Sequence, residues 1–136
     1  MSAIEKLLKE QGYSNKGINY YMNKRNYGEM KDPTIDYSYT GPCGDTMEIF
    51  IKILDGKIIN AKYLTIGCVG SFIAGSALTS LIKGKLLEEA EMINENDIKE
   101  YIGKMPHEKL DCICLAKRTF NKALKKYKCK SLKDYV

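Results

Sequence analysis

The sequence predicts an α+β fold, in which about five helices pack on a small antiparallel sheet of two or three strands. Residues 47–54 and 58–66 are rich in β-branched residues and are separated by Asp55-Gly56, a pair typical of tight hairpin turns. On both sides of this hairpin, apolar residues recur at helical spacing. We therefore expect helices before and after the sheet.

Before the hairpin, the sequence predicts two short helices and one edge strand. The first dozen residues form a helix that ends at Gly12, with an apolar stripe made of Ile4, Leu7 and Leu8. A second helix is expected over residues 15–23. The segment that follows is rich in turn residues and tyrosines, which indicates a long loop whose end, near residues 37–40, forms the edge strand.

After the hairpin, helical periodicity returns. A helix is expected to begin after Gly70 and to stop at Gly84, because apolar residues follow helical spacing at Ile73, Ala74, Ala77, Leu78, Leu81 and Ile82. A short helix is then expected over residues 86–93. Asn96 is a residue type that caps helices, which predicts a further helix ending at Gly103.

The C-terminal part is expected to be a single helix. Pro106 interrupts the chain, and the apolar positions that follow predict a last helix over residues 111–127 with lysines on its outer side. The residues after Lys128 are expected to fray. No repeat or shift in composition divides the chain, so residues 1–136 are expected to form one domain.

Composition places the chain among ordinary soluble proteins. Of its 136 residues, 44% are apolar and 29% charged, and the formal net charge is +5. The excess of lysine lies near the C-terminus, in "KRTFNKALKKYKCKSLK". No arginine-rich or mixed aromatic and basic signature accompanies it, so we expect a solvated helix face and no nucleic-acid partner.

The first residues lack the features of a signal peptide, and a cytoplasmic protein is expected. Residues 63–82 carry no charge, so they have to be considered as a membrane span. Eight of them are Gly, Ser or Thr, and "GCVGS" interrupts the stretch. The composition therefore favours a strand end followed by a small-residue helix, with no membrane partner.

The five cysteines point to metal or sulfur chemistry. Their number is odd and no export signal is present, so reduced thiols are expected rather than a disulfide framework. No two cysteines stand three positions apart, which excludes the spacing of a common zinc ribbon. Cys43, Cys68 and Cys112 are far apart in the sequence, so any shared site has to be assembled by the fold.

The stretch "TGPCGDTMEIF" has two interpretations. In an extended chain Cys43 and Asp45 would point to the same side, which suits half of a metal site. In a turn, Pro42 and Gly44 would break the strand, the Asp45 side chain would bond the backbone, and Cys43 would be a small buried apolar group. On these residues alone the turn is favoured.

Cys68 and Cys112 stand at the expected starts of helices. A helix N-terminus stabilises a thiolate, so we expect both thiols to have a pKa below the ordinary value of about 8.5. This property suits metal binding and sulfur acceptance.

Three segments carry a resemblance to a known family. "YTGPCGDTMEIFIKI", "AKYLTIGCVGSFIAGSALTSLIKGK" and "MPHEKLDCICLAKRTFNKAL" resemble the signature blocks of the NifU/IscU family of iron-sulfur cluster assembly scaffolds. Upstream, "YMNKRNYGEMKDP" resembles the family's N-terminal segment, so the likeness covers about residues 13–127. It implies the IscU-like α+β fold. It also implies a non-enzymatic scaffold that assembles a labile [2Fe-2S] cluster and transfers it to apo-proteins.

The resemblance also implies the residues of the site. Cys43, Asp45, Cys68 and Cys112 match the family's cluster-binding positions, and Cys112 matches the position that accepts persulfide from a cysteine desulfurase. The implied partners are this desulfurase and apo iron-sulfur acceptor proteins. One carboxylate among thiolates should make the cluster easier to release, because iron-sulfur clusters favour thiolate ligands.

The chain departs from the family at two positions next to Cys112. Asp111 replaces the family's usual histidine, and it could be an oxygen ligand or a helix cap, of which the cap is favoured. Cys114 lies about 200° from Cys112 around a helix, which favours a role as core filler. A spare ligand or a resolving thiol remains the alternative for Cys114. His107 is expected to be an exposed loop residue, and Cys129 to be unrelated.

Other partners and functions stay open at this point. "MPHEK" keeps only Pro106 and Lys109 of the family's Leu-Pro-Pro-Val-Lys segment, so the sequence leaves help from a DnaK-type chaperone open. A homodimer is open as well. The main alternative is a sulfurtransferase that holds Zn²⁺ and resembles the SufU branch, although the spacing from Cys68 to Cys112 lacks that branch's insertion. A cysteine hydrolase using His107 lacks an oxyanion motif.

Overall fold

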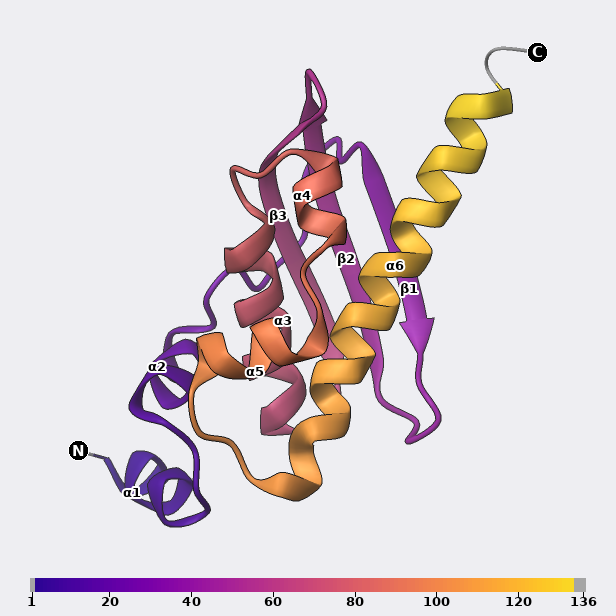
Figure 1. Ribbon diagram of the computed structural model, residues 1–136. Helices are drawn as coiled ribbons and strands as arrows, with labels where there is room; N and C mark the ends of the chain where they lie inside the picture. Colours follow the sequence, from indigo (N-terminus) through magenta and orange to yellow (C-terminus); the bar gives the residue numbers. More distant parts are fainter. Residues whose placement is uncertain (1, 134–136) are drawn as a thin grey trace.

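A three-stranded antiparallel sheet lies against a layer of helices (Figure 1). The computed structural model describes residues 2–133. Within these residues the strands are β1 (Ile35–Thr40), β2 (Thr46–Leu54) and β3 (Lys57–Ile66), in the order β1-β2-β3. The six α-helices of the same part of the chain are α1 (Ala3–Glu10), α2 (Asn15–Asn23), α3 (Val69–Ile82), α4 (Leu87–Glu91), α5 (Glu95–Ile102) and α6 (Leu110–Lys133). The predicted α+β class is confirmed.

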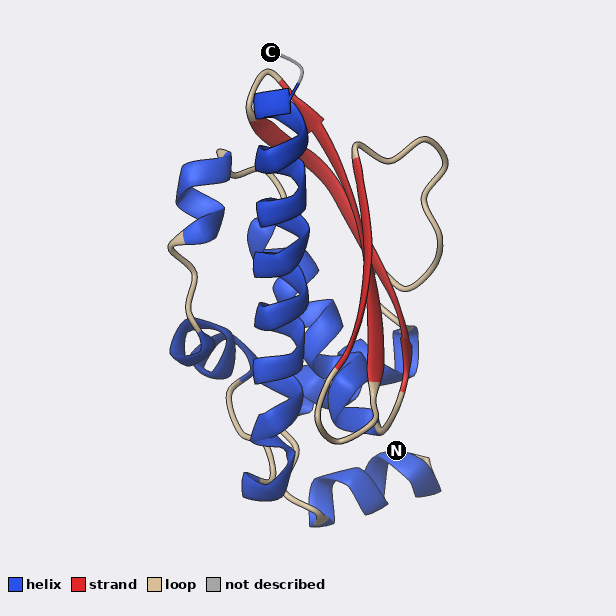
Figure 2. Cartoon of the chain, turned by 90° about the vertical axis from the view of Figure 1, so that its right-hand side faces the viewer, coloured by secondary structure: helices blue, strands red, loops and turns tan. Residues whose placement is uncertain are grey.

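The core lies between the sheet and its helices. Figure 2 shows the long C-terminal helix on one side of the sheet, the N-terminal helix below the sheet's lower end, and the long loop before β1 on the other side. α3 packs on β3, and α6 packs on β1, β2 and α3. The residues of this interface that are fully removed from solvent include Met47, Ile49, Ile51, Ile58, Ala61, Ile73, Ala74, Ala77, Leu78, Ala116, Phe120 and Ala123. Burial of so much apolar surface is the main force that holds α3 and α6 on the sheet.

The predicted hairpin is confirmed. Asp55 and Gly56 both have a positive φ, 53° and 76°, as a tight turn between β2 and β3 requires. β1 is an edge strand, as expected, but it begins at Ile35 rather than near Tyr37. The reason is that Ile35 pairs with Ile51 and is buried, so its side chain belongs to the core.

The start of α5 differs from the expectation. α5 is capped by Asn94 and not by Asn96: the Asn94 side chain accepts a hydrogen bond from the Asp97 N–H, and the Asp97 carboxylate accepts one from the Asn94 N–H. Such a reciprocal pair forms only where the third residue after the cap has a side chain that accepts a hydrogen bond. For Asn94 that residue is Asp97. Asn96 lies inside α5 and donates to Glu100 instead.

The last helix is longer than expected. α6 begins at Leu110 and continues to Lys133, so the prediction of fraying after Lys128 is wrong for residues 129–133. Residues 134–136 lie outside the described residues. Lys128 forms an ion pair with Glu91 near the end of α4, and the Lys117 ammonium donates to the Glu91 carbonyl oxygen. These contacts tie two points along α6 to the end of α4.

The lysines of α6 partly cover the sheet. Lys122 lies over the ring of Tyr39, with its ammonium 5.1 Å from the ring centre, and Lys126 lies over Tyr37 at 5.7 Å. Such cation–π contacts pair the basic helix with the tyrosines of β1. Among the helices of residues 2–133, none has the length and apolarity needed to span a bilayer.

Candidate functional site

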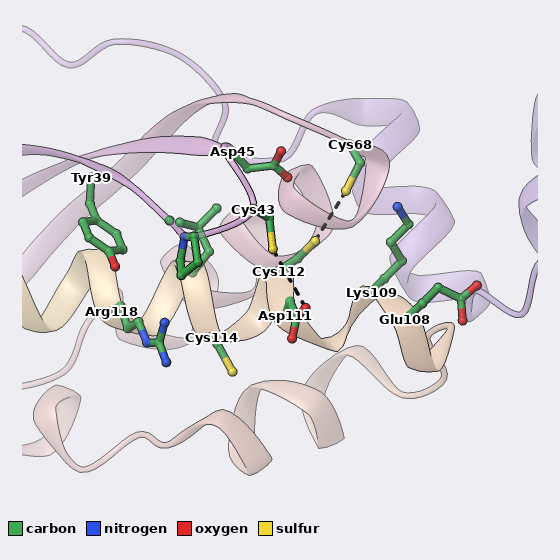
Figure 3. A pocket seen from close by; sticks show the side chains of 13 residues that line it. Tyr39, Cys43, Asp45, Cys68, Glu108, Lys109, Asp111, Cys112, Cys114 and Arg118 are labelled. Atoms are coloured by element: carbon green, nitrogen blue, oxygen red, sulfur yellow. Dashed lines mark hydrogen bonds between the residues drawn. The ribbon is translucent and has the colours of Figure 1, made fainter.

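Three segments that are far apart in the sequence meet at one end of the sheet (Figure 1). They are the β1–β2 loop, the junction of β3 with α3, and the start of α6. Together they enclose a cavity of about 450 Å³ (Figure 3). Its walls contain every ligand candidate from the sequence, namely Cys43, Asp45, Cys68, Asp111, Cys112 and Cys114, together with Tyr39, Gly41, Pro42, Glu108, Lys109, Leu115 and Arg118.

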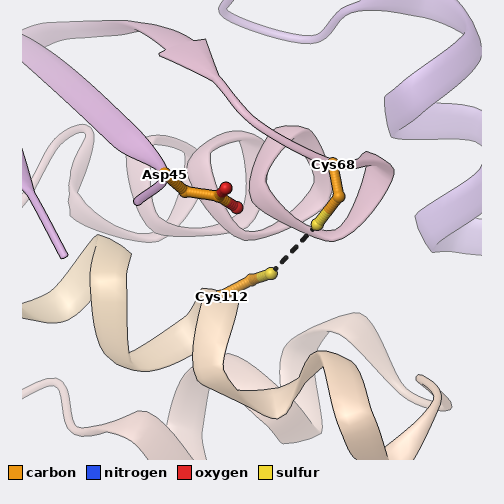
Figure 4. Close-up of side chains that lie close together, drawn as sticks. All are labelled: Asp45, Cys68 and Cys112. Carbon is orange, nitrogen blue, oxygen red and sulfur yellow. Dashed lines mark hydrogen bonds between the residues drawn. The ribbon is translucent and has the colours of Figure 1, made fainter. Parts of the chain in front are cut away.

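The centre of the site is a group of two thiols and one carboxylate. One ligand atom each from Asp45, Cys68 and Cys112 lies within 4.8 Å of the other two (Figure 4). The two sulfur atoms are 3.4 Å apart. Sulfur and carboxylate oxygen at such separations are a donor set that Zn²⁺ and iron accept. We refer to these three residues as the triad.

Two glycines allow the triad to form. A Cβ atom on Gly67 would lie 2.7 Å from a carboxylate oxygen of Asp45, and one on Gly70 would lie 2.9 Å from the Cys112 sulfur. Both separations are too short for a side chain to be added without displacing the ligand. The glycines on each side of Cys68 therefore let the carboxylate and the second thiol approach the start of α3.

The loop that carries Cys43 and Asp45 is a turn, as the sequence favours. The Gly41 N–H donates to the Asp45 carbonyl oxygen at 2.9 Å, and Gly44 has a φ of +89°. Because the chain turns here, the two side chains do not follow the alternation of a strand. Asp45 joins the triad, whereas Cys43 lies outside that group. Cys43 is exposed rather than buried.

Asp111 lies beside Cys43. The Cys43 sulfur is 4.0 Å from a carboxylate oxygen of Asp111, and both residues line the cavity (Figure 3). The expectation that Asp111 caps α6 is wrong, because the helix already begins at Leu110 and Asp111 lies within its first turn. A short 3₁₀ turn, His107–Lys109, leads directly into the helix and moves its start one residue earlier.

A hydrogen bond joins the two central thiols. The pKa of Cys68 is lowered to about 5, mainly because the Cys112 S–H donates to it, and the backbone N–H groups of Ser71 and Gly70 and the charge of Lys109 act in the same direction. The same hydrogen bond raises the pKa of Cys112, and burial raises it further. The expected lowering at a helix N-terminus is therefore right for Cys68. It is wrong for Cys112, because that thiol donates the hydrogen bond and is buried, and the charge of Cys68 adds to both effects.

The remaining cysteines and the histidine lie apart from the triad. Cys114 is half-buried and lines the cavity, so the expectation of core filler is corrected, yet its side chain points away from the triad in Figure 3. His107 is exposed, as expected, and is not among the described residues that line the cavity. Cys129 is exposed and lines a separate shallow hollow beside Glu91.

Sequence reasoning missed two neighbours of the site. Lys109 lines the cavity, and its side chain reaches toward Cys68 in Figure 3. Its only signal in the sequence is its place in the "MPHEK" segment. Tyr13 is buried, and its pKa is raised to about 12 by that burial, with a further effect from the thiols of Cys68 and Cys112. Nothing local marks Tyr13, because the packing of the segment between α1 and α2 decides its position.

The chain is similar to known proteins over most of its length. Residues 12–134 match the family model described as the NifU-like N terminal domain. The chain is 41% identical over 122 residues to the iron-sulfur cluster assembly scaffold protein IscU of Azotobacter vinelandii. The aligned region covers 85% of this chain and 94% of the relative. The chain is 34% identical over 116 residues to IscU 1 of Archaeoglobus fulgidus, covering 85% of this chain and 76% of the relative.

Solved structures share the fold. The N-terminal part of a NifU-like protein from Brucella abortus has a TM-score of 0.69 at 14% identity, covering 90% of this chain and 99% of that one. A putative scaffold protein for the SUF system from Fervidobacterium islandicum has a TM-score of 0.67 at 22% identity, covering 82% and 96%. At these identities the likeness concerns the fold alone.

Proposed function

The chain belongs to the NifU-like N-terminal domain family, and on that premise we propose that it is a scaffold for iron-sulfur cluster assembly. It binds iron and sulfide, builds a labile [2Fe-2S] cluster as its cargo, and transfers the cluster to apo-proteins. It has no catalysed turnover of its own in this role. The observation that carries the proposal is the convergence of Asp45, Cys68 and Cys112 in one cavity.

The donor set suits a cluster that has to leave again. Two thiols of the triad are ligands that iron-sulfur clusters favour, whereas the Asp45 carboxylate is a weaker, harder ligand. The cavity of about 450 Å³ has many times the volume of one water molecule, ~30 Å³, so it has room for more than a single ion. We assign Cys43 and Asp111 to a second metal position beside the triad, since both line this cavity.

Sulfur would come from a cysteine desulfurase, with Cys112 as the persulfide acceptor. Cys112 lines the cavity, so sulfur bound there would already be beside the triad. The recipients would be apo iron-sulfur proteins. Cys43 stands on an exposed loop at the cavity rim, where a partner protein could reach it.

A zinc-bound sulfur acceptor is the second candidate, and one observation favours it. The triad offers three ligands close together, and a structural or catalytic zinc site takes three or four such ligands in tetrahedral arrangement. In that role Zn²⁺ would hold the site in shape while Cys112 relays persulfide.

One reconstitution experiment separates the two candidates. The protein is incubated anaerobically with iron, cysteine and a desulfurase, and iron, zinc and acid-labile sulfide are counted per chain before transfer to an apo-ferredoxin is assayed. Iron and sulfide in equal amounts, passed to the ferredoxin, support the scaffold. Retained zinc with persulfide and no cluster supports the sulfur relay. Cys129→Ser is the matched control, since Cys129 lies outside the cavity.

A further inference from the structure

We propose that Cys68 is the nucleophile that frees sulfide from a persulfide on Cys112, by forming a Cys68–Cys112 disulfide. The inference rests on the proposed function, which puts the persulfide on Cys112. It adds a source for the two electrons that turn sulfane sulfur into sulfide, namely the thiol pair of the empty site itself.

The distance between the two sulfur atoms carries this inference. They are 3.4 Å apart, which is contact distance for two sulfurs. Cys68 lies just before α3, at the end of a loop that begins with Gly67, and Cys112 lies in the first turn of α6. Gly70 has no side chain to separate them, since a Cβ there would meet the Cys112 sulfur at 2.9 Å. Bond formation thus needs the two sulfurs to approach from 3.4 Å to the bond length of about 2.05 Å.

The step balances without a further reactant. The Cys68 sulfur attacks the inner sulfur of the Cys112 persulfide, a new sulfur–sulfur bond joins Cys68 to Cys112, and the bond to the outer sulfur breaks. Cys68 attacks as a thiolate, so the outer sulfur leaves with the electron pair of that bond and its own proton, as the hydrosulfide ion HS⁻. The outer sulfur is reduced by two electrons, and each cysteine sulfur is oxidised by one.

The position of the two sulfur atoms favours release of sulfide over transfer of the outer sulfur to Cys68. Attack on the outer sulfur would move the persulfide to Cys68 and release nothing. The atom that touches Cys68 in the structure is the Cys112 sulfur itself, which becomes the inner sulfur of the persulfide. Lys109 lines the same cavity and reaches toward Cys68 (Figure 3), so its positive charge faces the anion that develops as the outer sulfur departs.

Bound metal blocks this step, and an external dithiol restores the thiols after it. A metal bound by Cys68 occupies the sulfur electron pair that would attack, so a loaded site holds the persulfide unchanged. After release, the disulfide has to be reopened by an external dithiol before the thiols bind metal again.

The test uses the reduced, metal-free full chain, loaded with inorganic polysulfide and desalted without oxygen. Sulfide is measured with time, and intact mass and non-reducing peptide maps locate persulfide and disulfide. We expect sulfide and the Cys68–Cys112 disulfide to appear in equal amounts without added thiol. In Cys68→Ser, release should fall on the order of tenfold or more, because a hydroxyl does not replace a thiol in exchange, and the persulfide should remain on Cys112.

Matched variants and one metal control complete the design. Cys114→Ser changes a thiol of the same helix that points away from the pair, and it should release sulfide as the unaltered chain does. Prior addition of Zn²⁺ should suppress release. The inference is overturned if Cys68→Ser releases sulfide normally or if the persulfide moves to Cys68. It is also overturned if polysulfide leaves Cys112 unmodified, or if Cys43→Ser is the variant that loses release. Because polysulfide loading needs no desulfurase, a failure of the desulfurase to dock would count against the proposed function alone.

Discussion

The thiol of Cys43 lies 4.0 Å from a carboxylate oxygen of Asp111, although the two residues are 68 positions apart in the sequence. The contact joins the β1–β2 loop to the first turn of α6 across the mouth of the cavity. It gives the site a second sulfur and oxygen pair, in addition to the triad of Asp45, Cys68 and Cys112. Asp111 therefore lies beside Cys43 within the first turn of α6, and a role for it as a metal ligand belongs to the proposed function.

Asp111→Ala is expected to lower the iron affinity of the site about tenfold, because it removes one oxygen ligand or the group that orients Cys43. Iron and acid-labile sulfide per chain after anaerobic reconstitution measure the effect. Glu108→Ala is the matched control, since Glu108 is an acidic residue that lines the same cavity. Equal iron content in Asp111→Ala and the unaltered chain would show that Asp111 is no ligand.

Asp45→Ala is expected to slow cluster transfer and to prolong the lifetime of the bound cluster. The carboxylate is the weaker ligand beside two thiols, so its removal takes away the group that eases release. The half-life of the cluster chromophore, measured with and without apo-ferredoxin, tests this. Faster loss of the cluster from the variant than from the unaltered chain would contradict it.

Gly67→Ala is expected to weaken metal binding about tenfold while the fold stays intact. The added Cβ would lie 2.7 Å from an Asp45 carboxylate oxygen, so that ligand has to move. Zinc titration monitored against a competing chelator measures the affinity.

Gly75→Ala serves as the contrast to that variant. Its Cβ would lie 2.5 Å from the Tyr63 ring, in the core between α3 and β3, so it should cost about 1–3 kcal/mol of stability and leave the metal affinity of the folded protein unchanged. If Gly67→Ala lost stability to the same extent and kept its affinity, the role of Gly67 would be structural.

The free energy of unfolding should fall as the pH rises from about 4.5 to about 7. The pKa of Glu48 is raised from 4.5 to about 7, first by its hydrogen bond with Asp36, then by desolvation and by the charges of Asp36 and Glu29. In this range the folded chain keeps a proton that the unfolded chain loses, so rising pH favours unfolding. The effect should be less than about 1 kcal/mol, because the side chain is only half-buried and solvent screens its charge.

Urea unfolding at about pH 5.5 and about pH 8 measures this dependence. Glu48→Gln should flatten it, and Asp36→Asn should do the same by removing the partner carboxylate. A difference between the two pH values that survives in both variants would have to come from another group.

Cys114→Ser is expected to leave cluster assembly largely intact. Its thiol lines the cavity but points away from the triad, and it is half-buried, so the cost should be a small loss of stability, about 1 kcal/mol. Iron and sulfide per chain and the urea midpoint measure the two effects. A folded variant that binds no cluster would make Cys114 a ligand.

Local patterns were sufficient for much of the fold. The Asp55-Gly56 turn, the bounds of α2 and the helical spacing of α3 follow from turn chemistry and periodicity, which act over a few residues. The choice of Asn94 over Asn96 as a cap depended on which residue had Asp97 three positions later. The length of α6 was missed because its last turns are held by a contact with Glu91, far away in the sequence.

By itself, the sequence determined the elements, the residue types able to bind metal, and the three motifs that resemble a scaffold family. Only the tertiary structure decided that Asp45 joins Cys68 and Cys112, that Cys43 faces Asp111 instead, and that Cys68 rather than Cys112 has the lowered pKa. Cys68 and Cys112 are 44 positions apart, and their separation of 3.4 Å depends on how α3 and α6 pack on the sheet. Their protonation depends in turn on that separation, because one thiol can stabilise the charge of the other only when the two are in contact.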